Sequence, residues 1–429
     1  HSSGTITPPS TPTYPMHSKS SSASSIANSL SSLRRGDSTS SHTRRYRGES
    51  ISEALEGLEI ELPGSEELKA FQYQVSDYEV KDGDKKMPLG SGLWSDVYLG
   101  TPCLPRLEER ASTSIMSAGS AGSMPTPQMM MTPVKSRSSS VSKGGALPNI
   151  PRSYAIKHPA TKSSKAVLRS EALILSYLSR FPDSSTHVVD FYGQDMRSEA
   201  LVLRAMDATL ESYIQQDLNS LSEPERASKL KSIFPALARD LIESLEWLGS
   251  KSVVHADIKT ANILLETSST STSTSTSTST STPKAVYSDF SSSILVPPAT
   301  TTTHSSTTPA VNAGPLGGGT WDFLDPLLLS SSTPTSPSAQ SDLWSLAITL
   351  LTLVIGASPF DGAGNNVFRR REMVKQGTPL GYVGYGDDGL RNLTRLAGLG
   401  RNATAWFEMV LVRDVAKRVD VGRWREALL

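Results

Sequence analysis

Apolar residues recur at helical spacing in two long stretches of this chain. One runs from Lys165 to Ser179, and the other runs from Ser232 to Leu248, where apolar residues return every three or four positions. Pro235 suits the first turn of the second stretch because its missing N–H is not needed there, and Gly249 suits the position after the last turn. The pattern therefore predicts two amphipathic helices, each with one buried face.

A third stretch is apolar on every side. It runs from Leu346 to Ile355, interrupted only by two threonines, and it is too short to cross a bilayer. A helix that is apolar all round is buried in a core. Ser341 or Asp342 has the kind of side chain that caps a first turn, so we expect one of them to begin this helix.

Shorter apolar runs, most of them early in the chain, predict strands. The run from Leu89 to Leu99 predicts a hairpin around a glycine-containing turn. Three further runs predict single strands: Ser153–Lys157, Val188–Phe191 and Leu201–Leu203. Because strands dominate early and helices late, we expect an α+β fold with a small sheet-based lobe followed by a larger, mainly helical lobe.

Tracts rich in Ser, Thr and Pro divide the sequence. The first covers about residues 1–48 and has too few apolar residues to offset the entropy cost of ordering. We expect residues 1–70 to be mostly disordered, with one short amphipathic helix from Ile51 to Leu58, and residues 71–429 to form one domain. Four similar tracts predict loop insertions in that domain: 101–151, 267–282, 292–317 and 329–340.

Composition and charge narrow the classes of function. Lys+Arg and Asp+Glu are 42 each, so the net charge gives no reason to expect a nucleic-acid or membrane partner. Cys103 is the only cysteine, which excludes an intramolecular disulfide and suits a reducing compartment. No signal-peptide pattern and no oligomerisation element stand out in the sequence. We therefore expect a cytoplasmic or nuclear protein that is a monomer.

A polar segment directly before a strand-like run carries candidate chemistry. From His255 to Leu264 it reads His-Ala-Asp-Ile-Lys-Thr-Ala-Asn-Ile-Leu, which spaces a carboxylate, an ammonium and an amide by two and three residues. Phosphoryl transfer from ATP uses these groups. Asp257 would orient the incoming hydroxyl, Lys259 would neutralise charge on the moving phosphoryl group, and Asn262 would help to hold Mg²⁺.

Other motifs stand before and after this segment. Residues 90–97 read Gly-Ser-Gly-Leu-Trp-Ser-Asp-Val, and glycines there let backbone N–H groups approach phosphates, although an ordinary hairpin turn would look the same. Residues 154–157 read Tyr-Ala-Ile-Lys, and the following helix carries Glu171, a carboxylate that is costly to bury without a partner. Three later segments read Ser-Asp-Phe-Ser (288–291), Gly-Thr-Trp-Asp-Phe-Leu-Asp-Pro-Leu (319–327) and Ser-Asp-Leu-Trp-Ser-Leu (341–346).

Together these segments resemble the motifs of the eukaryotic-type protein kinase family, over roughly residues 78–429. They match, in order, the glycine-rich loop, V-A-I-K, the catalytic loop H-R-D-x-K-x-x-N, D-F-G and the end of the activation segment. The resemblance implies a two-lobed kinase fold with one main helix in the small lobe. It also implies ATP- and Mg²⁺-dependent transfer to Ser or Thr hydroxyls of protein substrates, because a Lys two residues after the catalytic Asp typifies Ser/Thr kinases.

The resemblance also implies the roles of individual residues. Catalytic roles fall to Lys157, Glu171, Asp257 and Lys259, and Glu171 pairs with Lys157. Metal ligands are Asn262 and Asp289. ATP contacts are Leu89, Gly90, Ser91, Gly92, Ser95, Val97, Ala155, Lys157 and Leu264.

Several positions depart from the family pattern, and one is Ser95, which replaces the third Gly of the glycine-rich loop. Ala256 replaces the Arg that meets a phosphate on the activation loop, Ser291 replaces the Gly of D-F-G, and Leu327 replaces the Glu of A-P-E. In the family that Glu pairs with a later Arg, which is Arg418 here, and Asp325 is the nearest substitute partner by sequence. Because Ala256 cannot bind a phosphate, we expect activity to be independent of activation-loop phosphorylation through this contact.

The departures leave alternatives open. One is a catalytically impaired pseudokinase that acts as a nucleotide-binding scaffold, although all six polar catalytic residues are present. Another is a small-molecule kinase, which the matches at residues 319–327 and 341–346 oppose. The expected partners are protein substrates, and Ser/Thr-Pro pairs are candidate sites for upstream proline-directed kinases: Thr126, Thr132, Thr308, Thr333 and Ser336. Arg369–Arg371 either docks an acidic substrate or forms a solvated helix face.

Overall fold

The computed structural model describes residues 66–81, 83, 87–104, 150–267, 282–296, 320–329 and 335–428. All of these belong to one unit, Glu59–Leu429. The predicted helix at residues 51–58 and the greater part of the predicted insertions lie outside the described residues.

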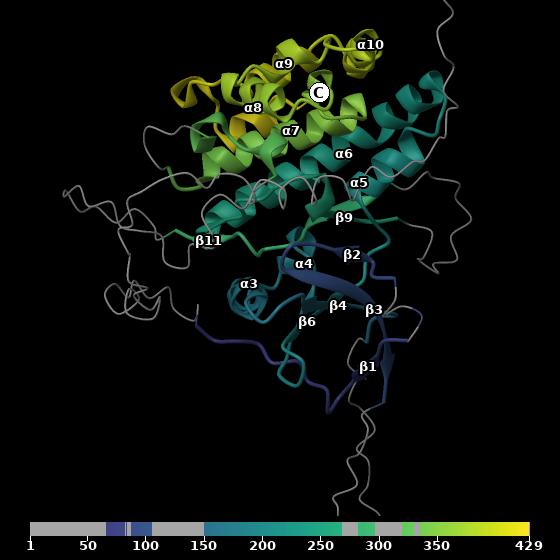
Figure 1. Ribbon diagram of the computed structural model, residues 1–429, viewed down its shortest axis with the longest axis vertical. Coiled ribbons are helices and arrows are strands. Elements are labelled where there is room, and N and C mark those ends of the chain that lie inside the picture. Colours follow the sequence, from purple (N-terminus) through teal and green to yellow (C-terminus); the bar gives the residue numbers. More distant parts are fainter. Residues whose placement is uncertain are drawn as a thin grey trace, which may run out of the picture. The chain divides into compact units, whose positions relative to one another are not determined.

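A six-stranded antiparallel sheet forms the small lobe, in the order β1-β3-β4-β6-β5 with β2 paired to β3, and helix α3 lies beside it (Figure 1). Val97 of β3 pairs with Lys157 of β4, so the end of the β2–β3 hairpin lies beside the candidate ATP-binding lysine. The elements are β1 (Asp77–Glu79), β2 (Gly90–Ser91), β3 (Ser95–Cys103), β4 (Tyr154–Pro159), α3 (Ser164–Leu178), α4 (Ser184–His187), β5 (Phe191–Asp195) and β6 (Ala200–Arg204).

The segment before β1 adds to the edge of this sheet. Ala70 forms a parallel bridge with Gln194 of β5, and the Phe71 N–H donates to the Gln194 carbonyl (2.9 Å). Gly193 allows this approach, since a Cβ there would lie 2.5 Å from the Phe71 nitrogen. The Lys69 N–H donates to the Ser176 hydroxyl (2.9 Å), so the same segment is attached to helix α3.

Helices dominate the second, larger lobe, whose long helices are α6 and α7 (Figure 1). Its helices are α5 (Leu210–Ser212), α6 (Glu223–Ser250), α7 (Ala339–Ile355), α8 (Val367–Gln376), α9 (Pro379–Tyr382), α10 (Gly389–Leu399), α11 (Ala403–Glu408) and α12 (Val421–Glu426). Its strands are β7 (Ala208–Thr209), β8 (Val253–Val254), β9 (Ile263–Glu266), β10 (Lys284–Tyr287) and β11 (Ile294–Leu295). The shorter helical turns are η1 (Tyr213–Leu218), η2 (Thr260–Asn262), η4 (Trp321–Phe323), η5 (Pro326–Leu329), η6 (Asp361–Ala363) and η7 (Val415–Lys417).

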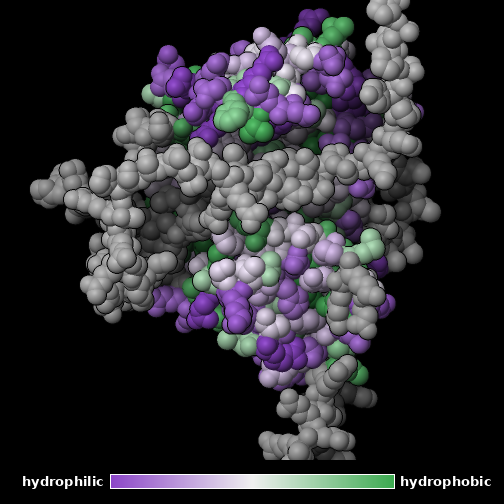
Figure 2. Space-filling view, in the orientation of Figure 1, coloured by the Kyte–Doolittle hydropathy of each residue, from purple (hydrophilic) through white to green (hydrophobic). Residues whose placement is uncertain are grey.

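The two-lobed α+β prediction is confirmed, and the central helix is buried as predicted. Every α7 residue from Ser341 to Ile355 is buried, and these side chains join the main core, which also takes in α3 and α6. On the face shown in Figure 2, hydrophilic residues predominate over the described surface and hydrophobic ones are scattered. No helix in the described ranges is both long and apolar enough to span a bilayer.

Several predicted boundaries are wrong for physical reasons. Helix α6 begins nine residues before Ser232, because Ser222 and Glu225 form a capping box, so Pro235 lies inside the helix rather than in its first turn. Helix α7 is capped by Ser338, not by Ser341 or Asp342. The strand predicted at Val188–Phe191 instead starts at Phe191, beside a register shift in its pairing with β6.

Ordered structure also extends into the edges of three predicted insertions. Strand β3 continues to Cys103, β11 pairs with β8 after residue 292, and α7 begins at Ala339. Strand pairing and a helix cap order these positions despite their polar composition.

Candidate active site

The catalytic-loop segment follows β8 and runs into β9, and its first residue, His255, is buried. The His255 Nδ1 accepts the N–H of Asp257 (3.3 Å), and its Nε2 lies 3.0 Å from the Ser288 carbonyl. Burial lowers the pKa of His255. The neutral ring with its proton on Nε2 fits both contacts, so His255 ties the catalytic loop to the strand end that carries Asp289.

Asp342 of helix α7 fixes the backbone of the same loop. Its two carboxylate oxygens accept the N–H groups of His255 (2.6 Å) and Ala256 (2.9 Å). Ala256 adopts a left-handed conformation (φ 66°), which is unfavourable for a residue with a Cβ and needs support from its surroundings. Burial raises the pKa of Asp342 to about 7, although the two N–H donors favour the charged form. A residue expected to cap a helix is instead an anchor for the catalytic loop.

Asp257 lies at the centre of the polar contacts on the large-lobe side. Its Oδ2 accepts the Lys259 ammonium (2.7 Å) and the Asn262 amide (3.1 Å), and its Oδ1 accepts the Thr320 N–H (3.2 Å). Lys259 also donates to the Thr320 hydroxyl (3.1 Å). These contacts hold the carboxylate and the ammonium next to each other, and they bring the end of the activation segment to them.

Lys157 links the small lobe to Asp289. Its ammonium lies 2.7 Å from both Glu171 carboxylate oxygens and 2.7 Å from Asp289 Oδ1. Burial alone would lower the pKa of Lys157, but the two carboxylates outweigh it and raise that pKa above its usual value. Burial raises the pKa of Glu171. The Lys157 ammonium and the Phe290 N–H, which donates to Glu171 (3.2 Å), act in the opposite direction and favour the charged carboxylate. The predicted pairing of Lys157 with Glu171 is confirmed.

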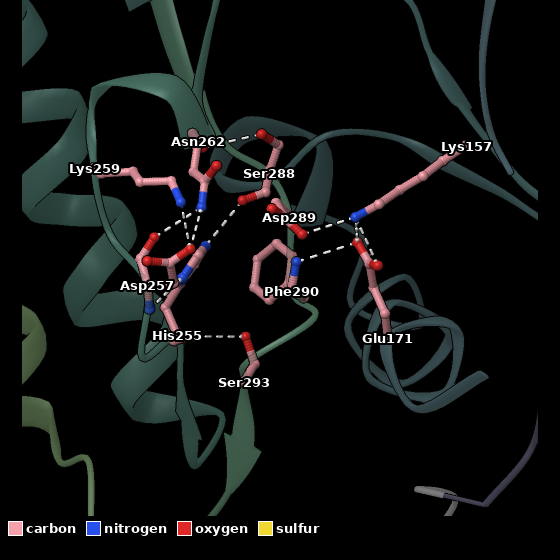
Figure 3. A network of polar contacts seen from close by, with 10 residues as sticks. All are labelled: Lys157, Glu171, His255, Asp257, Lys259, Asn262, Ser288, Asp289, Phe290 and Ser293. Atoms are coloured by element: carbon pink, nitrogen blue, oxygen red, sulfur yellow. Dashed lines mark hydrogen bonds and ion pairs between the residues drawn. The ribbon is translucent and has the colours of Figure 1, made fainter. Parts of the chain in front are cut away.

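Asp257, Lys259 and Asn262 form one group of side chains, the Asp257 cluster. Figure 3 shows Asp289 between this cluster on one side and Lys157 with Glu171 on the other. Asp289 has a left-handed backbone (φ 61°). Burial opposes its ionisation, but the Lys157 ammonium, a hydrogen bond from Ser291 and the Lys259 charge together outweigh it and keep the pKa of Asp289 well below its usual range. All six predicted polar residues therefore meet in one place.

The oxygen donors fit a magnesium ion held together with phosphates. Asp289 uses Oδ1 for Lys157, and Asn262 uses its nitrogen for Asp257, so one oxygen of each side chain is not taken by these bonds. Across the described ranges, no group of three or more His, Cys, Asp or Glu side chains could hold a metal by itself. Mg²⁺ commonly takes one or two protein carboxylates plus substrate phosphates, so this donor set is of the right kind.

The predicted ATP contacts lie on or beside three strands of the small lobe (β2, β3 and β4) and on one strand of the large lobe (β9). Six lie in or beside the β2–β3 hairpin, where the Leu89 N–H donates to Val97 (2.8 Å) and the Gly92 N–H to Ser95 (2.9 Å). Gly90 has open space around it, as a phosphate-binding loop requires. Ala155 is on β4 and Leu264 is on β9, and both pack against the main core.

Comparison with known proteins agrees with this geometry. The family model described as "Protein kinase domain" matches residues 148–419. The chain belongs to the protein kinase family. It is similar to the serine/threonine-protein kinase ISR1 of Eremothecium gossypii (28% identical over 222 residues, 48% of this chain and 53% of that protein). Similarity also extends to ISR1 of Saccharomyces cerevisiae (24% over 218 residues, 48% of this chain and 45% of that protein).

A more local similarity is to the serine/threonine-protein kinase TOS3 of Saccharomyces cerevisiae, at 27% over 147 residues, 32% of this chain and 23% of that protein. The chain spans about half the length of the ISR1 relatives it matches.

One departure from the protein kinase pattern is compensated as predicted. Arg418 is buried and forms an ion pair with Asp325, including a bond from Nη2 to Oδ1 of 3.2 Å. Arg418 also donates to the Val412 carbonyl (2.7 Å). Asp325 thus takes over the contact that the Glu of A-P-E makes in this family, from two positions earlier in the chain.

Two features of the site were not predicted from the sequence: the role of Asp342, and the contact of Thr320 with Asp257. The signal for Asp342 was present, since a carboxylate in a helix that is otherwise apolar on all sides requires a buried partner. No sequence signal paired Thr320 with Asp257, because the two are 63 residues apart and meet only in the folded chain.

Proposed function

We propose that this chain is an ATP- and Mg²⁺-dependent protein serine/threonine kinase. The observation that carries this proposal is the position of Asp289, which contacts Lys157 on one side and lies beside the Asp257 cluster on the other (Figure 3). A phosphate donor held at Lys157 and Asp289 would face a hydroxyl held at Asp257. The names of the similar proteins, which are serine/threonine-protein kinases, support the same activity.

The chain's own residues supply positioning and charge. Asp257 accepts a hydrogen bond from the incoming Ser or Thr hydroxyl and orients it, while Lys259 neutralises charge on the transferred group. Lys157, held by Glu171, binds the phosphates that remain on the nucleotide. Asp289 and Asn262 would hold Mg²⁺, which would supply positive charge to neutralise the phosphates.

The decisive experiment compares phosphate transfer to a generic Ser/Thr substrate by the wild type and by Asp257→Asn. We expect the variant to lose at least about a hundredfold in rate, the scale of a missing general base. Asp387→Asn is the matched control, because Asp387 is an exposed aspartate outside the site.

The comparison also guards against a copurifying kinase, which would label the Ser/Thr-rich chain equally in all three proteins. Equal transfer by wild type and Asp257→Asn, or no transfer by folded wild type, would refute the proposal. Nucleotide binding without transfer would then favour the scaffold alternative.

A further inference from the structure

Trp321 and Arg371 form an exposed pair beside the candidate active site. The Arg371 guanidinium carbon lies 4.2 Å from the centre of the Trp321 ring, which is cation–π distance. The Trp321 side chain is 37% exposed, and Arg371 is exposed as well. Helix α8, which carries Arg371, contacts η4, which begins at Trp321.

Neighbouring contacts hold this pair in place. Asp322 accepts the Ser358 hydroxyl (2.6 Å) and the Arg370 Nε (2.7 Å), which ties η4 to α8. The Ser345 hydroxyl donates to the Phe323 carbonyl (2.7 Å), which ties η4 to helix α7. A surface that is already ordered binds a ligand with less loss of conformational entropy.

The three consecutive arginines differ in charge compensation. Arg370 is neutralised by two carboxylates, since it also bonds to Asp361 (2.7 Å). Among the described residues, Arg371 forms no ion pair, and its contact is with the Trp321 ring. An exposed guanidinium without a carboxylate partner is a ready site for an acidic side chain, to which it can donate two parallel hydrogen bonds.

The pair lies next to the residue that contacts the catalytic carboxylate. The N–H of Thr320, the residue before Trp321, donates to Asp257 (3.2 Å). Neighbouring Cα atoms are about 3.8 Å apart. A peptide whose hydroxyl reaches Asp257 would therefore bring side chains one or two residues away to Trp321 and Arg371.

We propose that Trp321 and Arg371 select protein substrates that carry Asp or Glu within two residues of the phosphorylated Ser or Thr. This inference rests on the proposed kinase function. The Arg369–Arg371 run was expected either to dock an acidic substrate or to form a solvated helix face. We assign substrate docking to Arg371, whereas Arg370 holds η4 in place. Arg369 lies over the Tyr385 ring instead (5.8 Å) and has no part in the selection.

The test measures kcat/KM for peptides that place Asp, Ala or Lys at each position from two before to two after the acceptor. For the wild type we expect at least one position at which Asp exceeds Ala by roughly three- to tenfold, the range of an exposed to a charge-assisted pair. Arg371→Ala should lose this ratio, and Arg371→Glu should favour Lys over Asp. Arg369→Ala, on the same exposed helix, should keep the wild-type ratio.

The outcomes separate this inference from the proposed function. Wild-type transfer with no preference for Asp, or a preference that survives in Arg371→Ala, would refute the inference and leave the kinase function standing. No transfer to any peptide by folded wild type would refute the kinase function and the inference with it. Unchanged melting temperatures of both Arg371 variants would show that a lost ratio is not a folding defect, and the wild-type ratio should shrink as salt screens the charge.

Discussion

At the residue scale, the pair formed by Arg418 and Asp325 shows how a buried charge tolerates a change in its partner's position. Both side chains are almost completely buried, so water cannot solvate the Arg418 charge if its carboxylate partner is missing. A chain that lacks the A-P-E glutamate must therefore supply another carboxylate within reach. Asp325 does so, and Arg418 also stacks over the Trp344 ring at 4.7 Å.

We expect Asp325→Asn to lower the free energy of unfolding by about 3–5 kcal/mol, because it leaves Arg418 buried without a counter-charge. Denaturant titration measures this change. The matched control is Asp414→Asn, which breaks an exposed pair with Lys417 (3.6 Å) and should cost less than about 1 kcal/mol. Similar losses for the two variants would contradict the importance of the buried pair.

Asp342 leads to a pH prediction. Its pKa in the folded state is raised to about 7 from an ordinary 3.8, so between these values the folded protein holds a proton that the unfolded chain releases. The stabilisation from this proton is complete at low pH and is lost as the pH rises through about 7. We expect the wild-type melting temperature to fall more steeply from pH 5 to 8 than that of Asp342→Asn.

The variant should be less stable at every pH, because an amide can replace only one of the two accepting oxygens. The difference in slope is therefore the informative quantity. Parallel curves for wild type and Asp342→Asn would show that Asp342 does not titrate in this range.

The candidate site was largely predictable at this scale, and the reason is specific. Glu171 is a carboxylate among apolar helix residues, which requires a cationic partner, and Lys157 ends the strand that the sequence predicts before that helix. Asp342 sends the same signal, but a helix-capping role explained it equally well. Only the fold shows that its oxygens accept backbone N–H groups 86 and 87 residues away.

At the element scale, helix α3 was predicted to within one residue at each end, whereas α6 was predicted nine residues short at its start. Apolar periodicity defines α3 along its whole length. The first turns of α6 instead bury Arg226, whose guanidinium donates to the Val354 (2.9 Å) and Leu353 (3.0 Å) carbonyls at the end of α7. A pattern of apolar residues cannot predict this part of the helix, because its buried face includes the charged side chain of Arg226.

The segment before β1 lies outside the match to the family model, yet it belongs to the small lobe. Phe71 packs with Tyr154 and Ile156 of β4, and it is 6% exposed. Its backbone pairs with β5, while the neighbouring Lys69 bonds to α3. This segment therefore braces the helix that carries Glu171.

We expect Phe71→Ala to lower the free energy of unfolding by about 3 kcal/mol, the usual cost of removing a buried aromatic ring. Because the same segment braces α3, phosphate transfer should fall as well. Val75→Ala is the control, since Val75 is 53% exposed on the same segment and should leave both quantities nearly unchanged. Equal stability of the two variants would mean that the segment is not docked in solution.

At the scale of the whole molecule, the end of the activation segment is attached to the large lobe without a contact from residue 256. Thr320 bonds to Asp257 and Lys259, Asp322 bonds to Arg370, and Asp325 pairs with Arg418. The Ala256 side chain is a methyl group, so the family's usual bond from this position to a phosphate cannot form.

We therefore expect phosphatase treatment to leave most of the turnover intact, measured as phosphate transfer before and after treatment and removal of the phosphatase. A protein kinase that depends on the missing arginine contact would lose most of its activity under the same treatment. Near-complete loss here would show that a phosphate acts through some residue other than Ala256.

The cluster around Lys157 also has a consequence for the form in which nucleotide is accepted. One ammonium faces two carboxylates, Glu171 and Asp289, so with both carboxylates ionised these three groups carry one excess negative charge. A bare triphosphate would bring further negative charge to a place that already has an excess, whereas a triphosphate carrying its divalent cation would correct the imbalance. The lysine and its two partners would thus discriminate between free and metal-bound nucleotide through charge alone, independently of how well the adenine fits.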